Sequence, residues 1–536
     1  MPSGYLCFVL HAHLPFVRHP EHNDFLEEDW FYEGITETYI PLLEMMEGWE
    51  RDGIDWRLTM SVTPTLAAMF DDPLLQSRYV RNIDNLLSLS EKEVRRARFE
   101  PAFHKLAKFY YERFQICKSV FTEKYSNNLL NGFRRFHQTG KLELITCCAT
   151  HGFLPLMIDQ SPEGARVQIE QGAREHQRHF GVRPKGIWLA ECGYAPGVDN
   201  LLADAGIKYF FVDTHGVLFS TPRPRHGIFA PILCPGTRVA AIARDTESSK
   251  QVWSSIEGYP GDPAYREFYR DVGFDAPEDY IKPHLHEIGI RTHLGMKYYS
   301  ITGATDKKKP YDRPRAMEQS NKHAAHFLEH RIKQTKVLEP LMEDRPPLIL
   351  APYDAELFGH WWYEGPEFLD NLFRKTHSEQ NIVRMITIPE YMEAHPVMQE
   401  CRPLRSSWGA GGYAEVWLNP TNDWIYPHLH EAARRMTELV DKFTTPTELQ
   451  QRAMTVAARE LLLAQASDWA FIMKTGTVVE YAHKRTKEHV DNFNSIYVQL
   501  NDDTVKPEFL SELEWKSTLF PTLDYRLYQS SLNPNR

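Results

Sequence analysis

The sequence predicts an α/β protein in which a parallel sheet or barrel is followed by a domain made of helices. Three observations lead to this prediction. Short apolar runs typical of buried strands recur along residues 5–388. The stretches between these runs mostly have helical or loop character. After residue 405 the strand runs cease, and long amphipathic segments take their place. Such alternation is typical of parallel strands joined by helical crossovers.

Eight runs carry the strand prediction. In chain order they are YLCFVL, WRLTMSV, LELITCCA, GIWLA, KYFFVD, VAAIAR, LILAPY and VRMITI. Each is short for a helix, and most are rich in aliphatic or aromatic residues. Because they are spread over residues 1–404, we expect this part of the chain to form one barrel domain.

Two segments are expected to be purely helical. The first, at about residues 70–138, is rich in Leu, Arg, Glu and Lys with helical spacing, and it predicts a subdomain inserted between two strands. The second, residues 405–536, contains segments such as TPTELQQRAMTVAARELLLAQ and predicts an α-helical C-terminal domain. No flexible linker separates that domain from the barrel, so the two are expected to pack together.

Composition narrows the class of protein. The formal net charge of −11 argues against a nucleic-acid partner, because such binding depends on clustered Lys and Arg. The seven cysteines lack the CxxC spacing of a zinc site and are expected to be reduced thiols in a cytoplasmic protein. The N-terminal residues do not have the form of a signal peptide, and no apolar stretch predicts a membrane span.

Polar side chains follow the predicted strands at the point where each strand ends. They are His11 and His13, His151, Glu191, Asp213 and His215, Arg244, and Asp354. In a parallel barrel the carboxyl ends of the strands converge on one face, which carries the active site. Each residue taken singly could be a helix cap or a satisfied polar group. The repetition at six strands instead predicts one shared site.

The stretch APYDAELFGHWWYEG, residues 351–365, adds aromatic side chains to that site. Phe358, His360, Trp361 and Trp362 could form a platform for a sugar or a base, which a helix cap alone does not require. An aromatic site with two carboxylates favours glycoside chemistry, in which one carboxylate attacks the sugar and the other protonates the leaving oxygen. Spacing alone leaves open which of Glu191 and Asp354 plays which role.

Five segments in order give the chain a family resemblance. HAHLPF, ITCCATHGFLP, WLAECGY, APYDAELFGHWW and AEVWLNPTNDW together resemble glycoside hydrolase family 57, and within it the branching-enzyme group. The resemblance extends over nearly the whole chain, including AQASDWAFIM in the C-terminal part. It implies an incomplete (β/α)7 barrel with a helical insertion and an α-helical C-terminal domain. It also implies a retaining double displacement on α-1,4-glucans, with no cofactor and no metal.

Matching the motifs assigns roles to residues. Glu191 in WLAECGY matches the family's nucleophile, and Asp354 in APYDAELFGHWW matches its acid/base. The expected substrate-binding residues are His11, His13, Trp30, His151, Arg244, Trp253, Phe358, Trp361, Trp408, Trp417 and Asp468. For Trp30, Trp253 and Asp468, interface packing or capping is the competing interpretation. A metal held by the HAH histidines, His151 and Asp213 is a rival interpretation of the histidines.

The family resemblance leaves three functions to separate. In branching members a loop after the strand ending at Asp213 carries a tyrosine that shields the covalent intermediate, but the span from Thr214 to Gly258 contains no tyrosine. Phe229 or Leu233 could shield it instead. The favoured function is 1,4-α-glucan branching. Hydrolysis of the α-1,4-glucan or 4-α-glucan transfer is the second alternative, and a non-catalytic glucan-binding protein is the remote alternative. The Glu191 and Asp354 carboxyls are predicted to lie about 5–5.5 Å apart. The expected state is a monomer or small homo-oligomer.

Overall fold

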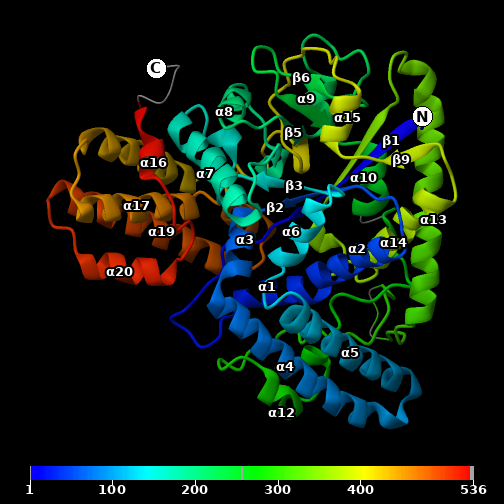
Figure 1. Ribbon diagram of the computed structural model, residues 1–536. Helices are drawn as coiled ribbons and strands as arrows, with labels where there is room; N and C mark the ends of the chain where they lie inside the picture. The colour runs from blue at the N-terminus through cyan, green and yellow to red at the C-terminus, as the bar shows by residue number, and fades with distance from the viewer. Residues whose placement is uncertain (1, 255–256, 304, 306, 531–536) are drawn as a thin grey trace.

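The computed structural model describes residues 2–254, 257–303, 305 and 307–530. Its centre is a curled, mostly parallel sheet with the strand order β6-β7-β5-β4-β3-β2-β1-β8, and β9 pairs with the start of β1 (Figure 1). The strands are β1 Gly4–Ala12, β2 Leu58–Val62, β3 Leu142–Cys147, β4 Gly186–Trp188, β5 Tyr209–Val212, β6 Ile232–Leu233, β7 Ala240–Ala243, β8 Leu348–Asp354 and β9 Val383–Met385.

The sheet is an incomplete barrel. Within the described residues, seven parallel strands run from β7 to β8, and β7 and β8 do not pair as strands. Backbone hydrogen bonds span this opening from Asp245 N–H to the Leu350 carbonyl at 2.8 Å and from Leu348 N–H to the Phe229 carbonyl at 2.9 Å. Each of the eight predicted runs contains a strand, which confirms the predicted fold class. The short antiparallel strand β6 was missed because two residues give no periodicity.

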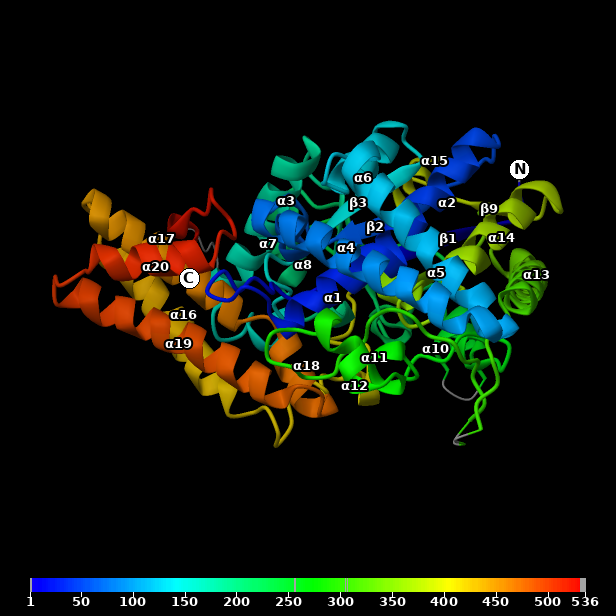
Figure 2. The ribbon, with the colours of Figure 1, turned by 90° about the horizontal axis from the view of Figure 1, so that it is seen from below.

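The helices cover the sheet and extend from it. They are α1 Asp29–Glu33, α2 Ile40–Arg51, α3 Pro64–Asp71, α4 Pro73–Arg96, α5 Pro101–Ser119, α6 Leu130–Gln138, α7 Pro162–Phe180, α8 Val198–Asp204, α9 Thr214–Leu218, α10 Thr246–Trp253, α11 Val272–Asp275, α12 Glu278–Ile281, α13 Arg313–Leu338, α14 Gly365–Ser378, α15 Ile388–Ala394, α16 Ile425–Lys442, α17 Glu448–Ala464, α18 Ser467–Thr475, α19 Val479–Asn501 and α20 Pro507–Lys516. Helices α4 and α5 pack on each other inside the predicted insertion (Figure 2).

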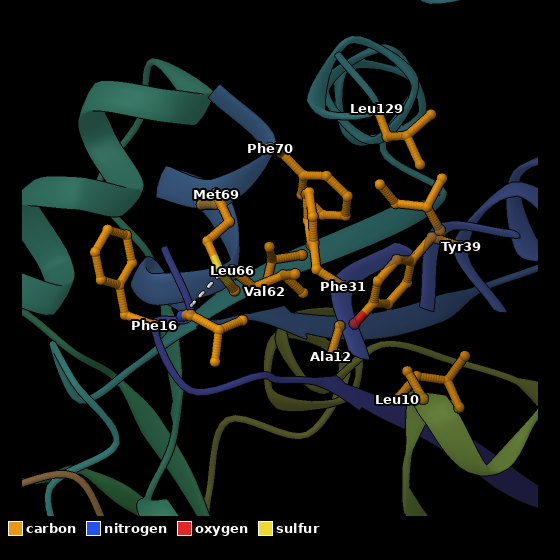
Figure 3. Packing of buried hydrophobic residues seen from close by; sticks show 14 of the residues in the cluster. Leu10, Ala12, Phe16, Phe31, Tyr39, Val62, Leu66, Met69, Phe70 and Leu129 are labelled. Atoms are coloured by element: carbon orange, nitrogen blue, oxygen red, sulfur yellow. Dashed lines mark hydrogen bonds between the residues drawn. The ribbon is translucent and has the colours of Figure 1, made fainter. Parts of the chain in front are cut away.

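The sheet is anchored by apolar packing on its helical side. Figure 3 shows Leu10 and Ala12 of β1, Val62 of β2, and Leu66 and Phe70 of α3 within one buried apolar cluster. All five side chains are essentially inaccessible to solvent. Burying such side chains stabilises the fold by about 1.5–3 kcal/mol for each large aliphatic or aromatic residue. This packing fixes the β1 end, where His11 and His13 emerge.

The C-terminal helices form a bundle beside the barrel (Figure 2). Helix α17 packs on α16, α19 and α20, and α18 turns from the bundle toward the sheet. Ala466, just before α18, bridges to Gly152 in the turn after β3, and Ser467 N–H donates to the His151 carbonyl at 3.1 Å. The domain boundary near residue 405 stays a prediction. No helix in the described ranges is long and apolar enough to cross a membrane.

Candidate active site

A cleft of about 810 Å³ lies at the carboxyl ends of the barrel strands. It also takes side chains from residues 408–417 and from α18. Of the residues predicted from sequence, those that line it are His11, His13, Trp30, His151, Glu191, Arg244, Trp253, Asp354, Trp361, Trp408, Trp417 and Asp468. Residues far apart in the chain are therefore gathered as the barrel geometry predicts.

Phe358 is the predicted substrate-binding residue that does not reach the cleft, and Trp362, Asp213 and His215, also expected at the site, do not line it. Its side chain is fully buried and packs in the core against Phe8, Tyr353 and Trp362. The expectation that it binds substrate is wrong, because the chain turns after β8 and directs Phe358 inward. Its neighbour Trp361 is 55% exposed and lines the cleft, stacked on Phe268 at 4.5 Å.

Glu191 follows β4 in a strained backbone conformation and is held by two donors. Its φ of 63° lies in the left-handed region that side chains other than glycine rarely adopt. Trp408 Nε1–H donates to Oε2 at 2.7 Å, and the Ser467 hydroxyl donates to Oε1 at 2.9 Å. Burial raises the pKa of Glu191 to about 7, while these two hydrogen bonds oppose the rise. Both donors therefore favour the ionised carboxylate.

Asp354 ends β8 in very different surroundings. No hydrogen bond to its carboxyl is made within residues 2–254, 257–303, 305 and 307–530. Burial, followed by the nearby carboxylates of Glu356 and Glu191, raises the pKa of Asp354 well above its usual range. A carboxyl in this environment keeps its proton more readily than Glu191 does.

Two neutral histidines connect β1 to the turn after β3. His11 Nε2 and His151 Nε2 lie 3.0 Å apart, and His11 Nδ1 lies 3.2 Å from the Ser61 hydroxyl. Burial lowers the pKa of both imidazoles well below the usual value. Since neither carries a charge, one Nε2 must donate to the other.

His13 forms an ion pair with a residue of the C-terminal domain. Its Nε2 lies 2.9 Å from Asp468 Oδ1, and its Nδ1 lies 3.1 Å from the Thr63 hydroxyl. Burial disfavours the charged imidazole, but Asp468 and then Glu356 and Glu191 outweigh burial, so the pKa of His13 is raised. Asp468 thus reaches the cleft from α18, as the sequence predicted.

Three side chains lie close enough together to hold a metal ion, but they are not the set that the sequence predicted. Ligand atoms of His13, His151 and Asp468 lie within 4.8 Å of one another. Asp213, which the rival hypothesis required, instead forms a two-pronged ion pair with Arg244 at 2.8 and 3.1 Å. That four-residue metal site is therefore wrong. In the smaller cluster the ring nitrogens of His13 and His151 and Asp468 Oδ1 are engaged in direct hydrogen bonds to protein groups, whereas Asp468 Oδ2 is buried and has no hydrogen-bond partner among the described residues.

Residues 214–239, between β5 and β7, do not line the cleft. Thr221 bridges to Arg402, and Leu233 pairs with β7 while its backbone bonds to residues near 400. Leu233 is buried, and the Phe229 carbonyl accepts from Leu348 N–H. Neither side chain lines the cleft, so the expectation that either could shield an intermediate is wrong.

Sequence reasoning missed two further polar residues. Glu356 lines the cleft and accepts from His13 N–H at 3.1 Å and from the Tyr39 hydroxyl. Ser467 bonds to both His151 and Glu191. Glu356 could have been noticed as a third carboxylate beside Asp354. Ser467 gave no signal apart from its position next to Asp468.

The fold and the site together define a class: a barrel with a pair of carboxylates in an aromatic-lined cleft, the arrangement typical of enzymes that cleave glycosides. The model of glycosyl hydrolase family 57 matches residues 7–402, and that of the 1,4-alpha-glucan branching enzyme C-terminal domain matches residues 428–528. The chain belongs to glycosyl hydrolase family 57.

The similar proteins of known name differ in the activity that they carry. The chain is 32% identical to the 1,4-alpha-glucan branching enzyme of Thermococcus kodakarensis, over 97% of this chain and 77% of that protein. It is similar to the structure of the alpha-amylase AmyC from Thermotoga maritima, at 45% identity and a TM-score of 0.92, covering 98% of this chain and 99% of that one. The branching enzyme from Pyrococcus horikoshii gives 30% identity and a TM-score of 0.87, covering 98% and 97%.

Proposed function

We propose that this protein is a 1,4-α-glucan branching enzyme that acts by a retaining mechanism. The observation that carries the proposal is the contrast between Glu191, held by two donors, and Asp354, which is half-buried and has none within the described residues. The match of residues 428–528 to the branching-enzyme C-terminal model supports the choice of reaction.

In the first step, a carboxylate oxygen of Glu191 attacks the anomeric carbon of an α-1,4-linked glucose. The glycosidic bond breaks as Asp354 gives its proton to the departing 4-oxygen, leaving a covalent glycosyl ester on Glu191. In the second step, the Asp354 carboxylate takes the proton from a glucan 6-hydroxyl. The resulting oxygen attacks the anomeric carbon and releases Glu191, which forms an α-1,6 branch.

Other side chains of the cleft are placed to bind the glucan chain. Trp30, Trp253, Trp361 and Trp408 are placed to stack on pyranose faces, which bind through apolar contact without demanding a charged ligand. Arg244 lies 6.0 Å from the Trp408 ring centre and is fixed by Asp213. These residues, with His11, His13, His151, Trp417 and Asp468, are the proposed glucan-binding set.

The experiment that tests the proposal uses amylose. We expect new chains released by isoamylase to exceed new reducing ends. A rise in reducing ends without branch chains would show a hydrolase instead.

Hydrolysis is the second candidate, and one observation favours it. Residues 214–239, between β5 and β7, contain no tyrosine and do not line the cleft, so they do not exclude water from the glycosyl ester. The similarity to a structure named as an alpha-amylase points the same way. A 4-α-glucan transferase would give neither branches nor new reducing ends, only redistributed chain lengths.

We further propose that the protein works in the cytoplasm as a monomer or small homo-oligomer. All seven cysteines are buried and free, as suits a reducing compartment. Light scattering on the purified protein would give the oligomeric state.

A further inference from the structure

We infer that Ser467 is a positioning residue for the nucleophile, supplied by the C-terminal domain to orient Glu191 and to set the tautomers of the two buried histidines. The inference rests on the proposed function in one respect, the role of Glu191. It assigns to the helical domain a part in the chemistry that differs from binding glucan.

The Ser467 hydroxyl lies between His151 and Glu191. Ser467 Oγ lies 2.8 Å from His151 Nδ1 and 2.9 Å from Glu191 Oε1. A serine hydroxyl has one proton to donate, and an ionised carboxylate can only accept. Ser467 must therefore donate to Glu191 and accept from His151 Nδ1–H.

That direction determines the rest of the chain of hydrogen bonds. With its proton on Nδ1, neutral His151 accepts at Nε2, so His11 donates from its Nε2 across the 3.0 Å contact. His11 Nδ1 then accepts from the Ser61 hydroxyl at 3.2 Å. In this order Ser467 and the two histidines each donate once and accept once, and Glu191 only accepts. The Ser61 hydroxyl, which also lies 3.4 Å from the Thr146 carbonyl, gives its single proton to His11. Removing the Ser467 hydroxyl breaks this order at the end nearest the reacting carboxylate.

The position of Ser467 does not depend on its side chain. Its backbone N–H donates to the His151 carbonyl at 3.1 Å, and the preceding Ala466 bridges to Gly152. The Thr150 hydroxyl donates to the Leu462 carbonyl at the end of α17, and Gln168 bonds to both Thr150 and Gln465. We therefore expect Ser467→Ala to fold with α18 in place.

The test follows the pH dependence of chain cleavage. The other titratable groups that face Glu191 are His13, His151, Asp354 and Asp468, and all remain in the variant. Because the lost hydrogen bond favoured ionised Glu191, Ser467→Ala should move the acid limb of kcat/KM to higher pH. We expect kcat to fall about 10- to 100-fold, the usual effect of losing a hydrogen bond to a charged group. KM should change little.

Two variants control the experiment. Ser467→Thr keeps a hydroxyl and should restore most of the activity and the wild-type acid limb. Ser406→Ala removes a buried hydroxyl that has no hydrogen-bond partner in the described part of the chain, so it should leave the profile unchanged.

Total cleavage of amylose is the readout, counted as reducing ends plus isoamylase-released chains. It therefore reports on Ser467 whether the enzyme branches or hydrolyses. An unshifted acid limb in Ser467→Ala, or an equal loss in Ser467→Thr, would overturn the inference. Absence of branch chains in the wild type would count against the proposed reaction alone.

Discussion

The carboxyl groups of Glu191 and Asp354 lie on two walls of the cleft and have different surroundings. On the Glu191 wall, Trp408 and Ser467 come from segments beyond the barrel strands and donate to the carboxylate. On the Asp354 wall, the carboxyl ends a buried strand near the carboxylates of Glu356 and Glu191. The difference teaches that the barrel strands place both carboxyls, while later segments supply hydrogen-bond donors to Glu191 alone, as the proposed nucleophile requires.

Replacing the nucleophile gives the largest expected effect. Glu191→Gln should reduce turnover on amylose by about 10⁴-fold or more, because no covalent ester can form. Initial rates with a coupled reducing-end assay would measure the loss. A decrease smaller than that of Asp354→Asn would reverse the roles assigned to the two walls. Unchanged activity would favour the non-catalytic glucan-binding alternative.

Replacing the acid/base should be less severe and depends on the leaving group. Asp354→Asn is expected to lower turnover on amylose by about 10²–10⁴-fold, the usual contribution of general acid–base catalysis. With an α-maltosyl fluoride donor, the first step should stay fast because fluoride needs no protonation to leave. Equal losses on amylose and on the fluoride would contradict an acid role for Asp354.

The pH profile follows from the same contrast. Glu191, with its pKa raised to about 7, must lose its proton, so activity should rise as pH increases through that region. Asp354, with its pKa raised well above the usual range, must keep its proton, so activity should fall at higher pH. A bell-shaped kcat/KM profile on amylose is expected, and a profile without an alkaline decline would contradict the assignment.

Removing one donor from the Glu191 wall should have a moderate effect. Trp408→Phe keeps an aromatic ring but loses the Nε1–H that bonds to Glu191. We expect a loss of about 10-fold or more in kcat and an acid limb moved to higher pH. Trp361→Phe is the matched control, since Trp361 lines the cleft without a hydrogen bond to either carboxyl. It should affect KM rather than the acid limb.

The smallest expected effect is on the free energy of unfolding and on how it depends on pH. A carboxyl whose pKa is raised by folding contributes stability that is complete below its unfolded pKa and is lost as pH rises, at about 1.4 kcal/mol for each pH unit. In Asp354→Asn and Glu191→Gln the carboxyl is absent, so this pH-dependent loss of stability does not occur. The unfolding free energy of each variant should therefore rise relative to that of the wild type as pH increases above about 4.

The two gains should end at different pH. For Glu191→Gln the gain should level off near pH 7, where the pKa of Glu191 lies. For Asp354→Asn it should continue to higher pH. Urea unfolding at several pH values would measure both curves, and superimposable curves would show that the two walls do not differ.

The sequence could predict the strands and the residues that end them. Glu191, Asp354 and His11 were visible because a short buried run places its next polar residue at the mouth of the barrel. It could not show that Phe358 turns inward while Trp361 turns outward, since both are aromatic residues in one loop. The turn of the backbone after β8 determines which ring points inward, and the sequence has no periodicity that would predict it.

The contribution of Ser467 was hidden for another reason. It depends on α18 folding back to the turn after β3, a contact between positions 316 residues apart. Sequence pattern carries no information on such docking without the family resemblance, which pointed to Asp468 alone. The short β6 and the buried course of the segment after β5 were likewise decided by tertiary packing.

Direct trapping of the covalent intermediate tests the central claim, that Glu191 is the nucleophile and Asp354 the acid/base. Asp354→Asn would be mixed with α-maltotriosyl fluoride, quenched and digested, and the peptides analysed by mass spectrometry. The fluoride allows the first step without an acid, and the missing base slows the second, so the ester should accumulate. We predict a maltotriosyl adduct on Glu191. An adduct on Glu356 or Asp468, or no adduct while product still forms, would contradict the account.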